Sequence, residues 1–147
     1  MKKILTCIMA LLLFASAVFA QRDLNCYPVF QGKVVPEKQM VVTEVRGSSV
    51  AAYKLDYYKG ISFQVEEDLA ARVASLIEAD AAAADVRETE KTGALLTYAL
   101  IQPKARGRTH RYLCYQARPV NGQWKVTLLY LEGPATLADL RGMFEKQ

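Results

Sequence analysis

Hydrophobic residues dominate the start of the chain in a way that no later segment repeats. Two lysines precede a run from Ile4 to Phe19 that has no charged side chain, and polar residues begin at Gln21. A cationic start, an apolar stretch of about 7–15 residues and small residues before a cleavage point are typical of a secretory signal peptide. A membrane-spanning helix needs about 20 apolar residues, more than this run or any later one offers. We therefore expect residues 1–20 to be cleaved as a signal peptide and residues 21–147 to have no transmembrane segment.

The next part of the chain alternates expected strands and helices. Residues 21–39 form an irregular N-terminal segment, interrupted by glycine and proline. The β-branched residues 40–45 and the alternating residues 61–65 each predict a strand. Between them, Ser48 or Ser49 could cap a short helix that runs to Tyr58. A longer helix follows the acidic residues 66–68, with its apolar side chains on one stripe formed by Leu69, Val73, Leu76, Ile77, Ala81 and Ala84.

The last part of the chain predicts three strands and a helix. After a polar turn over residues 88–93, the strands cover residues 94–102, 110–119 and 123–132. Asn121-Gly122 lies between the last two strands and is a strong hairpin signal, because both positions tolerate a positive φ. Thr136 is the expected N-cap of a terminal helix whose apolar residues recur at helical spacing.

These elements predict one α+β domain over residues 21–147. Their order is roughly β-α-β-α-β-β-β-α, which favours a mainly antiparallel sheet of 4–5 strands with helices packed on one face. The early β-α-β part could add a parallel pair and make the sheet mixed. Such folds carry many unrelated activities, so the fold class alone does not predict a function.

The charge balance argues against one class of partner. The formal net charge is +4 for 147 residues, and it falls to +2 when the two lysines of the signal peptide leave. Dedicated nucleic-acid binding would favour a strongly basic stripe. We therefore expect no nucleic-acid partner for the mature domain.

Two cysteines remain after cleavage, Cys26 and Cys114. In an oxidising compartment they could form a disulfide that pins the N-terminal segment to a late strand. Equally, Cys114 could be a small buried apolar residue. The sequence leaves both readings open.

No recognisable catalytic constellation is present in the sequence. His110 is the only histidine and lies in a basic run, so we interpret it as an exposed loop residue, and we expect no metal site and no cofactor. The acidic residues 66–68 fit a helix start, and Glu88 and Glu90 fit a solvated turn. A carboxylate pair that meets only in space would leave no signal here.

Two groups of residues are candidates for binding. The densest positive cluster, Lys104, Arg106, Arg108 and Arg111, could bind an anionic group at a turn, although charges also gather at hairpin tips for solvation alone. Tyr57 and Tyr58 could form part of a tyrosine surface for a partner, or could simply pack in the core.

Three segments give the chain a resemblance to a known group. They are residues 42–47 (VTEVRG), residues 54–58 (KLDYY) and the C-terminal stretch of residues 126–144. Together they resemble small exported proteins of Bacteroidetes that are classed only as domains of unknown function. The resemblance implies a Gram-negative envelope or secreted setting and assigns no catalytic or binding residue.

The sequence therefore favours a non-enzymatic binding module of the periplasm or cell envelope, with an unknown protein, peptide or anionic envelope component as its partner. One alternative is a small hydrolase-like enzyme whose carboxylates meet only in space. Another is a structural envelope protein that self-associates through an open strand edge or its tyrosines. The oligomeric state is not predicted.

Overall fold

The domain is built on a single antiparallel sheet. The structure, a computed structural model, describes residues 21–105 and 109–145. The strands are β1 (Val41–Arg46), β2 (Tyr57–Val65), β3 (Val86–Thr92), β4 (Leu95–Gln102), β5 (His110–Val120) and β6 (Gln123–Gly133). The helices are α2 (Tyr27–Phe30), α3 (Ser48–Ala51), α4 (Glu67–Ala82) and α5 (Leu137–Glu145), with a 3-10 turn η1 over Glu37–Gln39.

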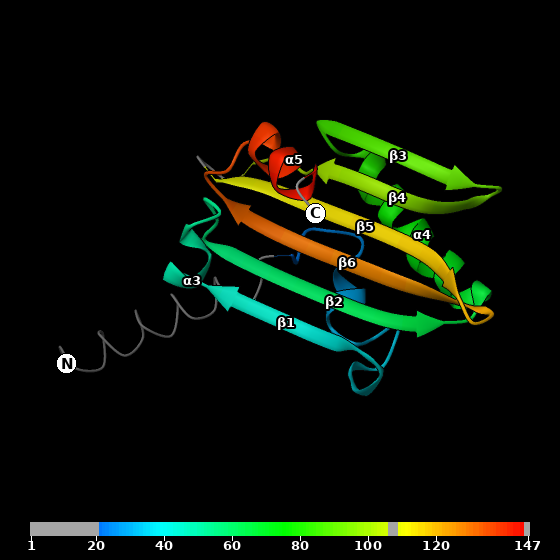
Figure 1. The fold of residues 1–147 in the computed structure, drawn as a ribbon. Helices are drawn as coiled ribbons and strands as arrows, with labels where there is room; N and C mark the ends of the chain where they lie inside the picture. The colour runs from blue at the N-terminus through cyan, green and yellow to red at the C-terminus, as the bar shows by residue number, and fades with distance from the viewer. Residues whose placement is uncertain (1–20, 106–108, 146–147) are drawn as a thin grey trace, which may run out of the picture.

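The strand order is β1-β2-β6-β5-β4-β3, and every neighbouring pair is antiparallel. The chain forms the β1–β2 hairpin, crosses the sheet through α4 to the far edge, and returns strand by strand until β6 closes against β2 (Figure 1). The 16 residues of α4 are long enough to make that crossing, since a helix rises about 1.5 Å per residue. The last strand therefore lies at the centre of the sheet.

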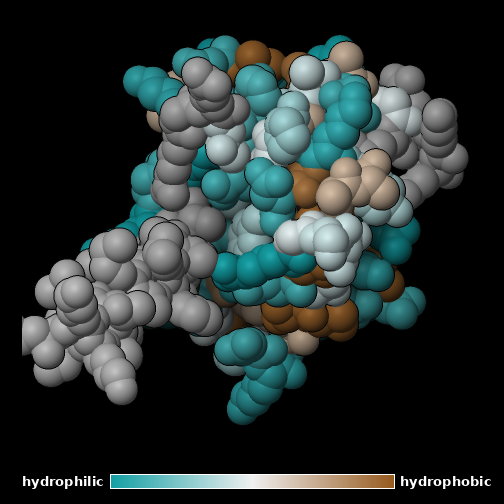
Figure 2. Space-filling model, turned by 90° about the vertical axis from the view of Figure 1, so that its left-hand side faces the viewer, coloured by the Kyte–Doolittle hydropathy of each residue, from teal (hydrophilic) through white to brown (hydrophobic). Residues whose placement is uncertain are grey.

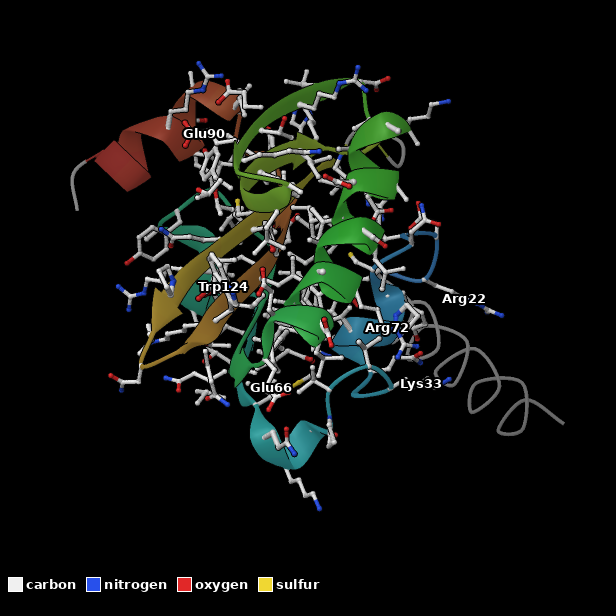
Figure 3. The ribbon with its side chains drawn as sticks, turned by 90° about the vertical axis from the view of Figure 1, so that its right-hand side faces the viewer. Arg22, Lys33, Glu66, Arg72, Glu90 and Trp124 are labelled. Atoms are coloured by element: carbon white, nitrogen blue, oxygen red, sulfur yellow. The ribbon has the colours of Figure 1, made fainter. Side chains whose placement is uncertain are left out.

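One face of the sheet is covered along its length. Val73, Ile77 and Ala81 of α4 pack on it in the larger hydrophobic cluster, as the helical periodicity predicts. Figure 3 shows α4 on one side of the strands and α5 on the other. On the second face, α3 and α5 form a smaller cluster around Tyr112 and Leu131. Helices thus pack on both faces, which corrects the expectation of one.

The N-terminal segment is part of the core. Cys26, Val29 and Val35 are fully buried on the α4 side of the sheet, and Figure 3 shows this segment beside α4. The buried carboxylate of Asp80 in α4 accepts hydrogen bonds from the backbone amides of Asn25 (2.6 Å) and Cys26 (3.0 Å). The N-terminal segment, which the sequence predicts to be irregular, is therefore held in place by the buried Asp80 carboxylate.

The sheet has six strands rather than 4–5, because residues 86–92 form an edge strand instead of a polar turn. The segment reads VRETEKT and is exposed along most of its length. An edge strand that covers no core needs no apolar face, so its polar sequence gives no alternation to detect. The early β-α-β part also adds no parallel pair, since β1 and β2 form a hairpin.

The helix expected from Ser48 to Tyr58 lasts a single turn and ends at Ala51. Lys54 has a φ of 58°, which breaks the helix, and β2 begins at Tyr57. Gly60, which follows the end of the expected helix, is consequently a mid-strand residue. The three later strands are confirmed to within one residue at each end, and the Asn121-Gly122 turn has positive φ at both positions.

The terminal helix begins as the sequence predicts. Thr136 and Asp139 form a reciprocal cap, in which the Asp139 carboxylate accepts from the Thr136 amide at 2.9 Å and the Thr136 hydroxyl accepts from the Asp139 amide at 3.2 Å. This hydrogen bonding from Thr136 lowers the pKa of Asp139. The cap fixes the start of α5 over the second face of the sheet.

Candidate functional site

Arg111, one of the predicted surface cations, is instead a buried structural residue. Its side chain is 1% exposed and forms a two-bond ion pair with Asp23, with nitrogen–oxygen distances of 2.8 and 2.6 Å. Its Nε donates to the Tyr130 hydroxyl at 2.8 Å, and that hydroxyl donates to Glu132 at 2.8 Å. Burial disfavours the charged guanidinium, but these hydrogen bonds outweigh it and raise the pKa of Arg111. Arg111 therefore anchors the N-terminal segment to β5.

The rest of the positive cluster is only partly described. Lys104 is exposed, and its backbone carbonyl accepts a hydrogen bond from Arg111 at 3.3 Å. Arg106 and Arg108 lie outside the described residues. The structure thus removes Arg111 from the cluster of candidate surface cations and leaves Lys104 on the surface.

Tyr57 and Tyr58 lie on opposite faces of β2 because neighbouring residues in a strand alternate. Tyr57 is buried on the α4 side, where Gln21 donates to its hydroxyl at 3.2 Å. Tyr58 is half-buried on the second face. The two tyrosines therefore do not form one surface: Tyr58 lines the apolar groove described below, and Tyr57 lines a polar hollow on the α4 side.

The two cysteines are free thiols and lie in different clusters. Cys26 packs in the larger cluster on the α4 side, and Cys114 packs against the smaller cluster on the second face. The sheet separates them, so the disulfide that the sequence left open is not formed here. Burial raises the pKa of both thiols, for Cys114 to about 12.

The second face of the sheet contains an apolar groove of about 520 Å³. The groove lies beside the part of this face that α3 and α5 cover. Its floor is made by side chains from the central strands and its rim by α3, the turn after it and α5. The lining residues are Thr43, Val45, Ser49, Val50, Tyr53, Leu55, Tyr58, Leu129, Leu131 and Leu140. Seen from the side on which α3 lies, hydrophobic residues reach the surface between polar ones (Figure 2).

Tyr58 and Gly60 shape the floor of this groove. A Cβ on Gly60 would lie 2.8 Å from the Tyr58 hydroxyl oxygen and 3.0 Å from Leu129. The absence of a side chain at Gly60 therefore lets the Tyr58 ring lie along the strand. Burial, followed by the nearby Cys114, raises the pKa of Tyr58, so its hydroxyl is a neutral group available to donate or accept a hydrogen bond in the groove.

A second hollow of about 310 Å³ continues the groove across the sheet. It shares Leu129 with the groove and is lined further by Tyr98, Leu100, Cys114, Tyr115, Gln116 and Thr127. Because the Cys114 pKa is raised to about 12 by burial, its thiol is protonated at neutral pH and is a poor nucleophile. The continuous surface from β1 to β4 is therefore suited to contact apolar groups rather than to covalent chemistry.

The α4 side has a polar hollow of about 320 Å³ that includes two carboxylates, Glu37 and Glu44. Glu44 forms ion pairs with Arg46 at 3.1 Å and with Lys59 at 3.8 Å. Such surface ion pairs are common without any catalytic role. Within residues 21–105 and 109–145, no cluster of three or more potential metal-ligating side chains occurs, and no helix is both long and apolar enough to cross a membrane.

Sequence reasoning missed most of the groove. Tyr58 is the one groove residue among the predicted binding residues. The sequence predicts Ser49 only as a possible helix N-cap and Leu129 only as part of a strand. The available signal was the second half of β6, where Leu129 and Leu131 are apolar on the face opposite Leu128 and Tyr130. That pattern indicates burial on both faces but cannot show that the second face is only partly covered.

The fold and the groove together define an α+β domain with an open antiparallel sheet that is covered on one face and partly open on the other. The chain belongs to a family of unknown function, DUF6108, whose model matches residues 13–144. No curated protein and no solved structure matches the chain.

Proposed function

We propose that this protein is a non-enzymatic binding module of the periplasm or cell envelope, and that the groove on the second face receives apolar side chains of a partner protein or peptide. The observation that carries the proposal is the uncovered apolar groove on an otherwise well-packed sheet. A pocket with an apolar lining and a few polar groups is the usual form of a binding site. Export is supported by the cationic and apolar pattern of residues 1–20.

The lining of the groove favours recognition of a protein or peptide. Two tyrosines contribute, and tyrosine offers a large contact area with one polar tip and is enriched where proteins bind each other. Tyr53 is 56% exposed at the rim, while Tyr58 lies on the floor. Leu129 and Leu131 provide the apolar surface beneath them.

Photo-crosslinking tests the proposal without knowledge of the partner. A photoreactive benzoylphenylalanine replaces Tyr53 at the groove rim or, as a control, Ser75 on the exposed surface of α4. Each protein is irradiated with an envelope fraction of the organism that encodes it. We expect a discrete adduct to a second protein from position 53 and none from position 75.

Equal adducts from the two positions, or adducts from neither, would contradict a binding role for the groove. N-terminal sequencing of the protein from the same envelope fraction tests export separately, and we expect it to begin at Gln21. A chain that keeps its first residues and remains in the cytosol would refute the proposed location. Turnover of a peptide or glycan substrate by the purified protein would refute the non-enzymatic role.

A further inference from the structure

Two positive side chains lie directly opposite each other on the second face of the sheet, near the β5–β6 turn. Arg118 of β5 is the register partner of Lys125 of β6. They share this face with Cys114 and Leu129, because residues four apart in a strand point to the same side. Like charges in this position destabilise a strand pair. Arg118 is exposed, Lys125 is half-buried, and neither forms an ion pair with a described residue. No ion pair within the described chain therefore offsets this repulsion.

Uncharged polar side chains connect the two cations to the apolar surface. Thr127 and Gln116 lie opposite each other, two residues further along β6 and β5, and both line the hollow of about 310 Å³. Two residues further still, Leu129 lies opposite Cys114 and belongs to both the hollow and the groove. Figure 1 shows α3 and α5 towards the other end of the sheet, away from the β5–β6 turn. The second face therefore changes from charged to polar to apolar along these two strands.

The spacing of these residues fits an extended peptide. Lys125 and Leu129 are four residues apart, which is about 13 Å along a strand. In an extended peptide, side chains four residues apart are separated by the same distance of about 13 Å and point the same way. One peptide could therefore place an acidic side chain on the cations and an apolar side chain on Leu129. Small-molecule sites bury most of their ligand, whereas the groove and the hollow are open to solvent, which favours a peptide over a free fatty acid.

We propose that the bound partner segment has an aspartate or glutamate side chain that contacts Arg118 and Lys125, four residues from an apolar side chain that contacts Leu129. This proposal rests on the proposed function, because it describes the peptide that the second face receives. The carboxylate would offset the repulsion between the two cations and accept charge-assisted hydrogen bonds from them. Selectivity would then come from the spacing of an acidic and an apolar residue.

A phage-displayed library of random decapeptides, selected on the purified protein, tests the predicted spacing. We expect the enriched peptides to share an apolar residue with an acidic residue four positions away. One enriched peptide is then synthesised with blocked termini, and a second version has the matching amide in place of the acidic side chain. Fluorescence anisotropy should show about fivefold weaker binding of the amide version, because an ion pair at an exposed site contributes modestly.

A neutral double variant, Arg118→Gln with Lys125→Gln, removes both positive charges. It should bind the acidic peptide and its amide version equally, since the carboxylate has lost its partners. Because the repulsion is also gone, its free energy of unfolding in urea should equal or exceed that of the wild-type protein. The matched control is Arg72→Gln with Lys33→Gln, which makes the same charge change on the α4 side (Figure 3) and should keep the fivefold preference for the acidic peptide.

The outcomes separate this proposal from the proposed function. Enriched peptides that share apolar residues but no acidic residue at this spacing would overturn the acidic contact and leave the groove as a peptide site. The same preference for the acidic peptide in the wild-type protein and the neutral double variant would overturn it equally. A double variant that is less stable than the wild-type protein would show that the two cations stabilise the fold, contrary to the proposal. A library that yields no enriched peptide would count against both the acidic contact and the proposed function.

Discussion

At the residue scale, Arg111, which looks functional in the sequence, and Asp80 are both structural residues. Arg111 is buried against Asp23 and Tyr130, and Asp80 holds the amides of Asn25 and Cys26. Buried charges occur in proteins when they are paired and hydrogen-bonded, as these are. A dense run of basic residues in sequence therefore does not reveal which member points inward, because that depends on a partner 88 residues away.

Alkaline pH should destabilise the protein through Cys114. Burial raises the pKa of this thiol from 9.0 to about 12. Because the folded state keeps the proton, the stabilisation is fully present below pH 9 and is lost as the pH rises towards 12. We expect the free energy of unfolding, measured with urea between pH 8 and pH 11, to fall steadily above pH 9.

A Cys114→Ala variant provides the comparison for this pH dependence. Its free energy of unfolding should fall less steeply over the same pH range. Some pH dependence should remain, because burial also raises the pKa of Tyr115 to about 12. Identical slopes for the variant and the wild-type protein would show that Cys114 does not titrate as described.

At the element scale, the sequence predicts the strongly patterned elements and misses those whose character depends on position in the sheet. Three local features are confirmed: the apolar stripe of α4, the β5–β6 hairpin and the N-terminal cap of α5. β3 was missed because an exposed edge strand needs no apolar alternation. The start of β2 was read as helix because nothing local marks the break at Lys54.

Gly133 is an element-scale contact that tolerates no side chain. A Cβ there would lie 2.6 Å from the Leu55 Cα and 2.8 Å from the Lys54 carbonyl oxygen, both of which are backbone atoms. Gly133→Ala should therefore force β6 away from the α3–β2 connection and destabilise the protein by about 1–3 kcal/mol. Urea unfolding measures this loss.

Gly142 in α5 is the matched control for Gly133. A Cβ there meets no described atom within 4 Å, and alanine is favoured over glycine in a helix by up to about 1 kcal/mol. Gly142→Ala should leave stability unchanged or raise it. A Gly133→Ala variant as stable as the wild-type protein would contradict the close approach of the two segments.

At the scale of the whole molecule, the sheet is asymmetric in two ways. Among the described residues, α4 and the N-terminal segment cover one face, while α3 and α5 cover part of the other. One edge is protected by charge, while the other carries exposed valines. The open face supports the proposed partner site. The sequence could predict neither asymmetry, because both depend on which surfaces remain uncovered after folding.

The central claim is that the groove on the second face is the binding site, and a pair of matched substitutions tests it most directly. Ser49→Arg places a long charged side chain at the groove, whereas Ser75→Arg makes the same change on the exposed surface of α4. Affinity for the partner found by crosslinking is measured for both variants and the wild-type protein. We predict at least tenfold weaker binding for Ser49→Arg, equivalent to about 1.4 kcal/mol, and unchanged binding for Ser75→Arg. Equal affinity in all three proteins would contradict the account.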